Sequence, residues 1–133
     1  NTPYDKTHDF SINSEYILSK KLKIVGNFIY QTGQPTNYPN SQYTYMNLNV
    51  PNYGKRNSQR LPNYHRMDIN LTLTPDKKNK KIEGSWVFGI YNLYDRDNAS
   101  SIIFRRNNET LKNEAVQISI FGIVPSVTYN FKF

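Results

Sequence analysis

The chain has 133 residues and a formal net charge of +7, from 17 Lys and Arg against 10 Asp and Glu. A chain of this length forms one domain at most. It contains no cysteine, which excludes disulfide scaffolds, thiolate nucleophiles and Cys-ligated metal sites. We expect no transmembrane helix, because no apolar window approaches roughly 18 residues. We also expect no signal peptide, because the start NTPYDKT lacks a basic flank and an apolar core. A β-barrel membrane protein stays possible, since its lumen-facing positions are polar.

Aromatic residues make up 14% of the chain, which favours strands over helices. Alternating apolar and polar residues predict two strands, at residues 8–19 and 22–32, joined by a tight turn at Lys20 and Lys21. Each of these strands has one largely apolar face. Residues 33–61 are expected to form one long irregular loop, because prolines and Gly54 interrupt any regular element.

Residues 66–74 alternate cleanly, with Met67, Ile69, Leu71 and Leu73 on one face and polar residues on the other. The next strand covers residues 82–94, and its periodicity does not decide which face is apolar. Residues 101–106 form a short strand or an extension of the previous one, and 107–113 form a second loop. The last strand, 115–133, is expected to bend near Gly122 and Pro125. The fold class is therefore all-β, an antiparallel meander of about five long strands.

The lengths of the connections alternate along this meander. Short turns at Lys20 and Lys77 alternate with long loops at 33–61 and around 107–113, as in membrane barrels with short periplasmic turns and long outer loops. The strands reach the roughly 9 to 11 residues that cross a bilayer, whereas strands of soluble domains have about 5 to 6. Because the smallest single-chain membrane barrels have about 8 strands, five strands indicate a piece of a larger barrel.

Four motifs follow one another in the chain: TGQPTNYP, RLPNYHRMDINLTLT, WVFGIYNLYDRDNAS and the final FGIVPSVTYNFKF. In this order and spacing they resemble the carboxy-terminal part of a TonB-dependent outer-membrane receptor of the Bacteroidota type. The resemblance covers essentially the whole chain. It implies that residues 1–133 are the last five strands of a 22-stranded transporter barrel in the bacterial outer membrane, with the plug and the earlier strands absent.

The same resemblance implies a transport function and a set of partners. The function is energy-coupled uptake of a nutrient such as a metal chelate, glycan or peptide, with no enzymatic activity, cofactor or metal. The partners are outer-membrane lipid, the remainder of the same barrel with its plug, the TonB complex through the absent amino-terminal part, and the barrel-assembly machinery. Whether a surface lipoprotein caps the barrel is left open. The assembly machinery would read an aromatic signal at Tyr129, Phe131 and Phe133.

Candidate site residues follow from this topology. The outer loop carries Tyr38, Tyr43, Tyr45 and Tyr53, which suit ligand binding, although loops that pack on each other use the same residue types. Polar Arg66, Asp68 and Asn70 are expected to face the lumen, with an ion pair between the first two. Tyr30, Trp86 and Tyr94 are candidates for the aromatic girdles at the bilayer interfaces, and plain strand propensity is the alternative.

Two other readings of the whole chain compete with the receptor. One is a soluble surface β-sandwich module that binds carbohydrate or nucleic acid. Nucleic acid is not expected as a partner, because the Lys clusters lie in turns and are not gathered on one surface. The other reading is a small complete membrane barrel with a structural or adhesive role.

Overall fold

The computed structural model describes residues 2, 4–46, 48–75, 83–107, 109 and 113–132. The chain divides into two compact units. The first, which we call the sheet unit, comprises residues 10–30, 65–96 and 121–133. The second, the loop unit, comprises residues 1–9, 31–64 and 97–120. Strands and turns make up the described ranges, which include no helix long and apolar enough to cross a membrane.

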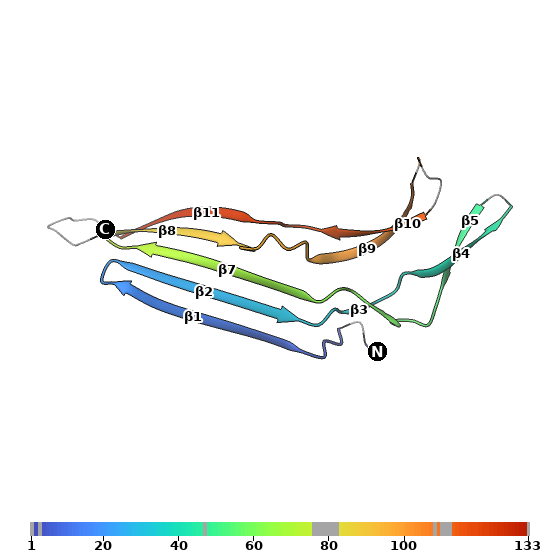
Figure 1. Ribbon diagram of the computed structural model, residues 1–133, viewed down its shortest axis with the longest axis horizontal. Coiled ribbons are helices and arrows are strands. Elements are labelled where there is room, and N and C mark those ends of the chain that lie inside the picture. The colour runs from blue at the N-terminus through green and yellow to red at the C-terminus, as the bar shows by residue number, and fades with distance from the viewer. Residues whose placement is uncertain are drawn as a thin grey trace. The chain divides into compact units, whose positions relative to one another are not determined.

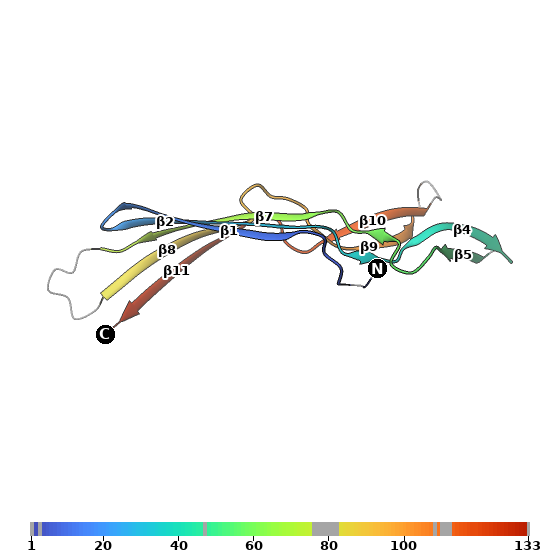
Figure 2. The same cartoon turned by 90° about the horizontal axis from the view of Figure 1, so that it is seen from below.

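One five-stranded antiparallel sheet forms the basis of the sheet unit, in the order β1-β2-β7-β8-β11 (Figure 1). The strands are 9 to 11 residues long, which confirms the expected meander of about five long strands. Their bounds are Asp9–Ser19, Leu22–Gln31, Tyr64–Leu73, Glu83–Tyr91 and Val124–Lys132. Figure 2 shows these strands in a single twisted layer. The described strands form an open sheet with edges at β1 and β11, and they do not close into a barrel.

The strand register decides which face of β8 is apolar. Leu71 lies opposite Phe88 in the β7–β8 pair, and Val127 lies opposite Phe88 in the β8–β11 pair. Residues directly opposite each other in an antiparallel pair share a face of the sheet. Trp86, Phe88 and Ile90 therefore lie on the same face as the apolar residues of β7 and β11. Periodicity alone could not decide this, because both parities of β8 carry apolar residues.

One face of this sheet is apolar across all five strands. Phe10 of β1 stacks on Tyr30 of β2 at 5.2 Å between ring centroids, and Trp86 of β8 contacts Tyr129 of β11 at 4.6 Å. None of the hydrophobic residues that the structure describes is buried. On the apolar face, side chains such as Tyr16 and Phe131 keep 66% and 64% of their surface exposed. The described strands of the sheet unit thus enclose no hydrophobic core.

Three small two-stranded sheets form the loop unit. They pair β3 with β6, β4 with β5, and β9 with β10. Their bounds are Pro35–Thr36, Pro39–Tyr45, Leu48–Tyr53, Gln59–Arg60, Ala99–Arg106 and Asn113–Ser119. The expectation that residues 33–61 are irregular is therefore wrong. Proline is tolerated at the first residue of a strand and on edge strands, and in a two-stranded sheet every strand is an edge.

The expected last strand, 115–133, is divided into β10 and β11. The break lies at residues 120–123, close to the bend expected near Gly122. The first part pairs with β9 and the second part with β8. The alternative in which residues 101–106 form a separate short strand is confirmed, because β9 has its own partner.

Arg60 holds the base of the loop unit together. Its Nη2 lies 2.7 Å from Oδ2 of Asp5, and its Nη1 donates a hydrogen bond of 2.9 Å to the carbonyl oxygen of Gly33. Gly33 is required at this point for space, because a Cβ there would overlap the carbonyl oxygen of Leu61. The glycine of the TGQP motif thus allows two backbone segments to approach closely.

Candidate functional site

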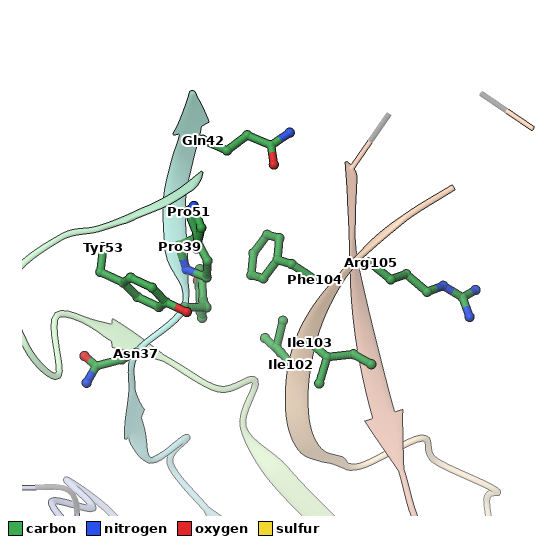
Figure 3. A pocket seen from close by; sticks show the side chains of 10 residues that line it. Asn37, Pro39, Gln42, Pro51, Tyr53, Ile102, Ile103, Phe104 and Arg105 are labelled. Carbon is green, nitrogen blue, oxygen red and sulfur yellow. The ribbon is translucent and has the colours of Figure 1, made fainter. Parts of the chain in front are cut away.

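A cavity of about 440 Å³ lies in the loop unit between the β4–β5 hairpin and β9 (Figure 3). Tyr38, Pro39 and Tyr53 line one side, and Ile102 and Phe104 line the other. Figure 3 shows Phe104 pointing toward the hairpin, whereas Arg105 points away from it. The volume lies in the range of small-ligand sites, which are typically lined by apolar and aromatic side chains with a few polar groups. The cavity is therefore a candidate ligand site.

Two of the four tyrosines expected to bind ligand line this cavity. Tyr38 lies 5.8 Å from Phe104 between ring centroids, and its hydroxyl donates a hydrogen bond of 3.1 Å to Oε1 of Gln59. Tyr53 lies on the hairpin side of the cavity. The ring of Tyr38 therefore has fixed neighbours, whereas the side chain of Tyr53 is 59% exposed.

The other two tyrosines, Tyr43 and Tyr45, do not line the cavity. They lie opposite Val50 and Leu48 in the β4–β5 pair, whereas Gln42, which lines the cavity, is on the alternate face. Because side chains of a strand alternate between faces, Tyr43 and Tyr45 point away from the cavity. Their side chains are largely exposed.

The contribution of β9 to the cavity was missed from the sequence. Residues 101–106 were expected to form a strand, but no site residue was assigned there. The available signal was the apolar run Ile102, Ile103 and Phe104 in a segment flanked by polar loops. A run of this kind predicts a buried strand as readily as a binding wall, so periodicity could not separate the two.

A second cavity, of about 220 Å³, is lined by the same two stretches of chain. Thr32 and Gln34 lie on one side, and Ala99 and Ser100 lie on the other. The first stretch continues into Tyr38 and Pro39 of the larger cavity, and the second continues into Ile102 and Phe104. Successive parts of β9 therefore border the two cavities.

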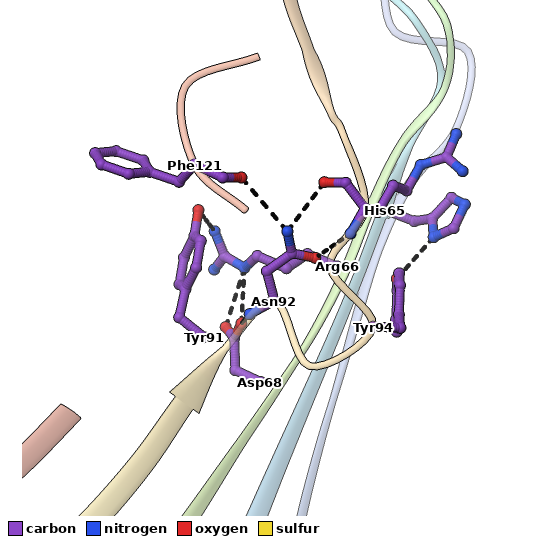
Figure 4. Close-up of polar contacts among 8 residues, drawn as sticks. His65, Arg66, Asp68, Tyr91, Asn92, Tyr94 and Phe121 are labelled. Atoms are coloured by element: carbon purple, nitrogen blue, oxygen red, sulfur yellow. Dashed lines mark hydrogen bonds and ion pairs between the residues drawn. The ribbon is translucent and has the colours of Figure 1, made fainter. Parts of the chain in front are cut away.

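The expected ion pair between Arg66 and Asp68 is present on the polar face of β7 (Figure 4). Nε of Arg66 lies 2.9 Å from Oδ1 of Asp68, and its Nη1 donates a hydrogen bond of 2.6 Å to the hydroxyl of Tyr91. The guanidinium also lies 4.0 Å from the ring centroid of Tyr91, a cation–π contact. Asn70 shares this face and lies next to Gly89 and Ser126. These polar residues of β7 are held by neighbours in β8 and β11.

Asn92, which the sequence reading did not single out, is fully buried at the end of β8. Its φ is 54°, in the left-handed region that asparagine tolerates better than most residues. The side-chain Nδ2 donates to the carbonyl oxygens of Arg96 at 2.9 Å and Phe121 at 3.4 Å. Oδ1 accepts from the backbone N–H of Arg96 at 3.1 Å. The amide thus joins the turn after β8 to the segment before β11 (Figure 4). An Asn directly after a strand was the only signal for it.

Aromatic residues gather at both ends of the apolar face of the sheet unit. At one end, Nδ1 of His65 lies 2.7 Å from the hydroxyl of Tyr94, and Tyr30 stacks on His65. Partial burial raises the pKa of Tyr94, and the positive charge of Arg96 opposes this in part. At the other end, Trp86 and Phe131 flank Tyr129. Phe133, the last residue of the expected assembly signal, lies outside the described residues.

The described part of the chain has no cluster of three or more His, Cys, Asp and Glu that could hold a metal ion. No family model, curated protein or solved structure matches the chain.

Proposed function

We propose that the chain is the carboxy-terminal wall and outer-loop part of a TonB-dependent transport receptor in a bacterial outer membrane. The observation that carries the proposal is the apolar face of the five-stranded sheet, which continues over strands of 9 to 11 residues and is left uncovered by the described residues. Strands of this length cross a bilayer when tilted. The opposite face carries Arg66, Asp68 and Asn70, which suit a watery lumen.

The size of the apolar face argues against exposure to water. Eleven of its large apolar side chains are at least 36% exposed: Phe10, Ile12, Tyr16, Leu18, Leu73, Trp86, Phe88, Ile90, Val127, Tyr129 and Phe131. Large apolar and aromatic side chains bury up to about 150–250 Å² each, so this patch is on the order of 1,000 Å². Patches above a few hundred Å² on soluble monomers mark interaction or membrane surfaces. Contact with lipid would remove all of these apolar side chains from water.

The open edges of the sheet support a larger barrel. Unpaired backbone groups in hydrocarbon cost several kcal/mol each, so membrane strands occur in closed barrels. In this proposal β1 and β11 pair with strands of the remaining barrel, whose total is 22 by the resemblance. The plug and the segment that contacts the TonB complex belong to that remainder. Coupling to energy therefore resides outside these residues.

Two aromatic rows, one at each end of the apolar face, support strands that cross a membrane. His65, at the start of β7, belongs to one row, and Leu73, at its end, lies opposite Trp86 of the other. Girdles of aromatic residues flank the apolar band of membrane barrels.

The short turn at Lys20 and Lys21 would lie at the periplasmic rim. The loop unit, whose segments follow β2 and β8, would face the outside and capture the nutrient.

The soluble sandwich alternative has less support. A sandwich buries the apolar face of one sheet against a second sheet about 10 Å away, which produces a core of buried side chains. No hydrophobic side chain is buried in the part of the chain that the structure describes. Binding of carbohydrate or nucleic acid by a soluble module therefore lacks the scaffold on which it would depend.

The full-length protein that contains these residues tests the proposal. Single cysteines at positions 69, 70, 71 and 72 of the outer-membrane form would be treated with a lipid-soluble and a water-soluble maleimide. We expect lipid-phase labelling at 69 and 71 and aqueous labelling at 70 and 72, because these residues alternate between the two faces. A protein that stays in solution without detergent, or that shows aqueous labelling at all four positions, would refute the proposal.

A further inference from the structure

Strand β9 borders both cavities of the loop unit. Residues 102–105 line the larger cavity and residues 99–100 the smaller one, whereas no residue of β10 lines either. Successive side chains of a strand point to opposite faces. Residues of both faces, 102–105, therefore border the larger cavity, so the cavity reaches the backbone of β9 as well as its side chains. Figure 3 shows this alternation, with Phe104 pointing toward the hairpin and Arg105 pointing away from it.

One edge of β9 has no strand partner among the described strands. β9 pairs with β10 alone, in a two-stranded sheet. An unpaired edge presents N–H and C=O groups at the spacing of a β-ladder and is a template for another polypeptide strand. From Ala99 to Arg105 the edge is about 20 Å long, at a rise of about 3.3 Å per residue. It can therefore pair with an extended segment of about six residues.

The side chains that line the two cavities indicate which kind of segment would fit beside β9. Tyr53, Pro39 and Phe104 offer apolar and aromatic surfaces in the larger cavity. Gln34, Thr32 and Ser100 offer neutral polar groups in the smaller one. Arg105 is the only Lys, Arg, Asp or Glu among the residues that line the two cavities. The two cavities thus suit a largely neutral segment, because Arg105 points away from the hairpin.

We propose that the free edge of β9 binds an extended peptide of about six residues by strand addition. The peptide backbone pairs with residues 99–105, and alternate side chains enter the cavity beside Phe104 and Tyr53. Strand addition supplies affinity through backbone hydrogen bonds and specificity through pockets for alternate side chains. A peptide is favoured over an oligosaccharide because only a polypeptide backbone presents donors and acceptors that match a β-edge. This inference rests on the proposed function for its location, in which the loop unit faces the outside.

The test uses the full-length receptor, purified in detergent and shown to be folded by heat-modifiable migration. The probe is a pool of random-sequence octapeptides blocked at both ends, and retention is measured by equilibrium dialysis with mass spectrometry. Retained peptides are then synthesised with N-methyl groups at alternate residues, in the two possible registers. We expect one register to bind roughly tenfold or more weakly and the other to bind as the parent does, because only alternate N–H groups face a paired edge.

A pair of variants tests the place of binding. Phe104→Ala should weaken binding of the retained peptides roughly tenfold, since it removes an aromatic wall of the cavity. Ile118→Ala on β10 is the matched control, because Ile118 is as exposed as Phe104, at 39% against 40%, and does not line either cavity. Ile118→Ala should leave binding within about twofold, a change that a lost surface side chain produces through stability alone.

Three outcomes would overturn the inference. They are a folded receptor that retains no peptide, equal binding of both N-methylated registers, and retention of maltoheptaose in place of peptides. Each leaves the barrel proposal standing, because heat-modifiable migration reports the barrel independently. A receptor that never reaches the outer membrane would count against the proposed function and so against the location of this site.

Discussion

The carboxylate of Asp68 accepts a hydrogen bond of 3.0 Å from the backbone N–H of Asn92. This contact joins the polar face of β7 to the turn that ends β8. The same carboxylate pairs with Arg66, so one side chain serves both an ion pair and a turn. The polar face of the sheet and the entry to the segment before β11 are therefore stabilised by one connected network, in which each member restricts the others.

Replacing Asn92 should destabilise the folded protein. Asn92→Ala removes buried hydrogen bonds to Arg96 and Phe121 and places an alanine at a positive φ, so we expect a loss of about 2–4 kcal/mol. Asn92→Gly loses the same hydrogen bonds but accepts the backbone angle, and should be less destabilising by about 1 kcal/mol. Guanidinium unfolding of the full-length protein in lipid vesicles measures both. Equal stability of wild type and Asn92→Ala would show that the amide contacts contribute nothing.

Arginine substitutions on neighbouring residues of β7 test which face meets lipid. Leu71→Arg should destabilise the barrel by about 2–4 kcal/mol if this position lies near the bilayer midplane. Thr72→Arg, the matched control on the opposite face, should change stability by less than about 1 kcal/mol, because a lumen-facing charge stays hydrated. Unfolding titrations in vesicles provide the comparison. A larger effect of Thr72→Arg would reverse the facing of the sheet.

Gly84 of β8 makes room for the ring of Tyr129. A Cβ at this position would overlap the phenol of Tyr129, which lies over the glycine from the neighbouring strand. Because the contact is with the far end of the Tyr129 ring, which is 45% exposed, Gly84→Val should displace the ring at a cost of less than about 1 kcal/mol. In the double variant with Tyr129→Ala the valine should cost less, which a double-mutant cycle of unfolding free energies detects. Strict additivity of the two changes would contradict the contact.

Labelling of intact cells tests the orientation. Lys55→Cys in the outer loop should react with a membrane-impermeant maleimide, whereas Lys20→Cys in the turn between β1 and β2 should react only after the cells are opened. Lys20 and Lys55 are both exposed, so accessibility of the side chain does not distinguish them. The parent protein serves as the background, since these 133 residues contain no cysteine. The opposite pattern would invert the topology.

The 133 residues expressed alone should aggregate and should not form a monomeric barrel. β1 and β11 are edges of the described sheet, and open edges of long apolar strands associate with other chains. Refolding into lipid vesicles, followed by sizing and circular dichroism, measures this. A heat-resistant, monodisperse monomer would show that these strands suffice, and would remove the need for the rest of a larger barrel.

The sequence by itself determined the long strands of the sheet unit and, except in β8, the polarity of their faces. Alternation is a local property, so Met67, Ile69, Leu71 and Leu73 share a face wherever the strand is placed. The ion pair of Arg66 with Asp68 follows from the same spacing. The prediction of an irregular loop at residues 33–61 was wrong, because proline does not prevent the formation of edge strands.

Only the tertiary structure decided which residues from distant segments meet. The apolar face of β8 became known from its register with β7 and β11, since both parities of that strand carry apolar side chains. The ring of Tyr38 contacts that of Phe104, 66 residues later in the chain. The side chain of Asn92 bonds to the backbone carbonyl of Phe121, a group that every residue has and that gives no sequence signal. Such contacts depend on how the chain returns on itself. Hydrophobic periodicity and turn propensity describe residues that are close in the sequence, so they do not predict which distant segments come into contact.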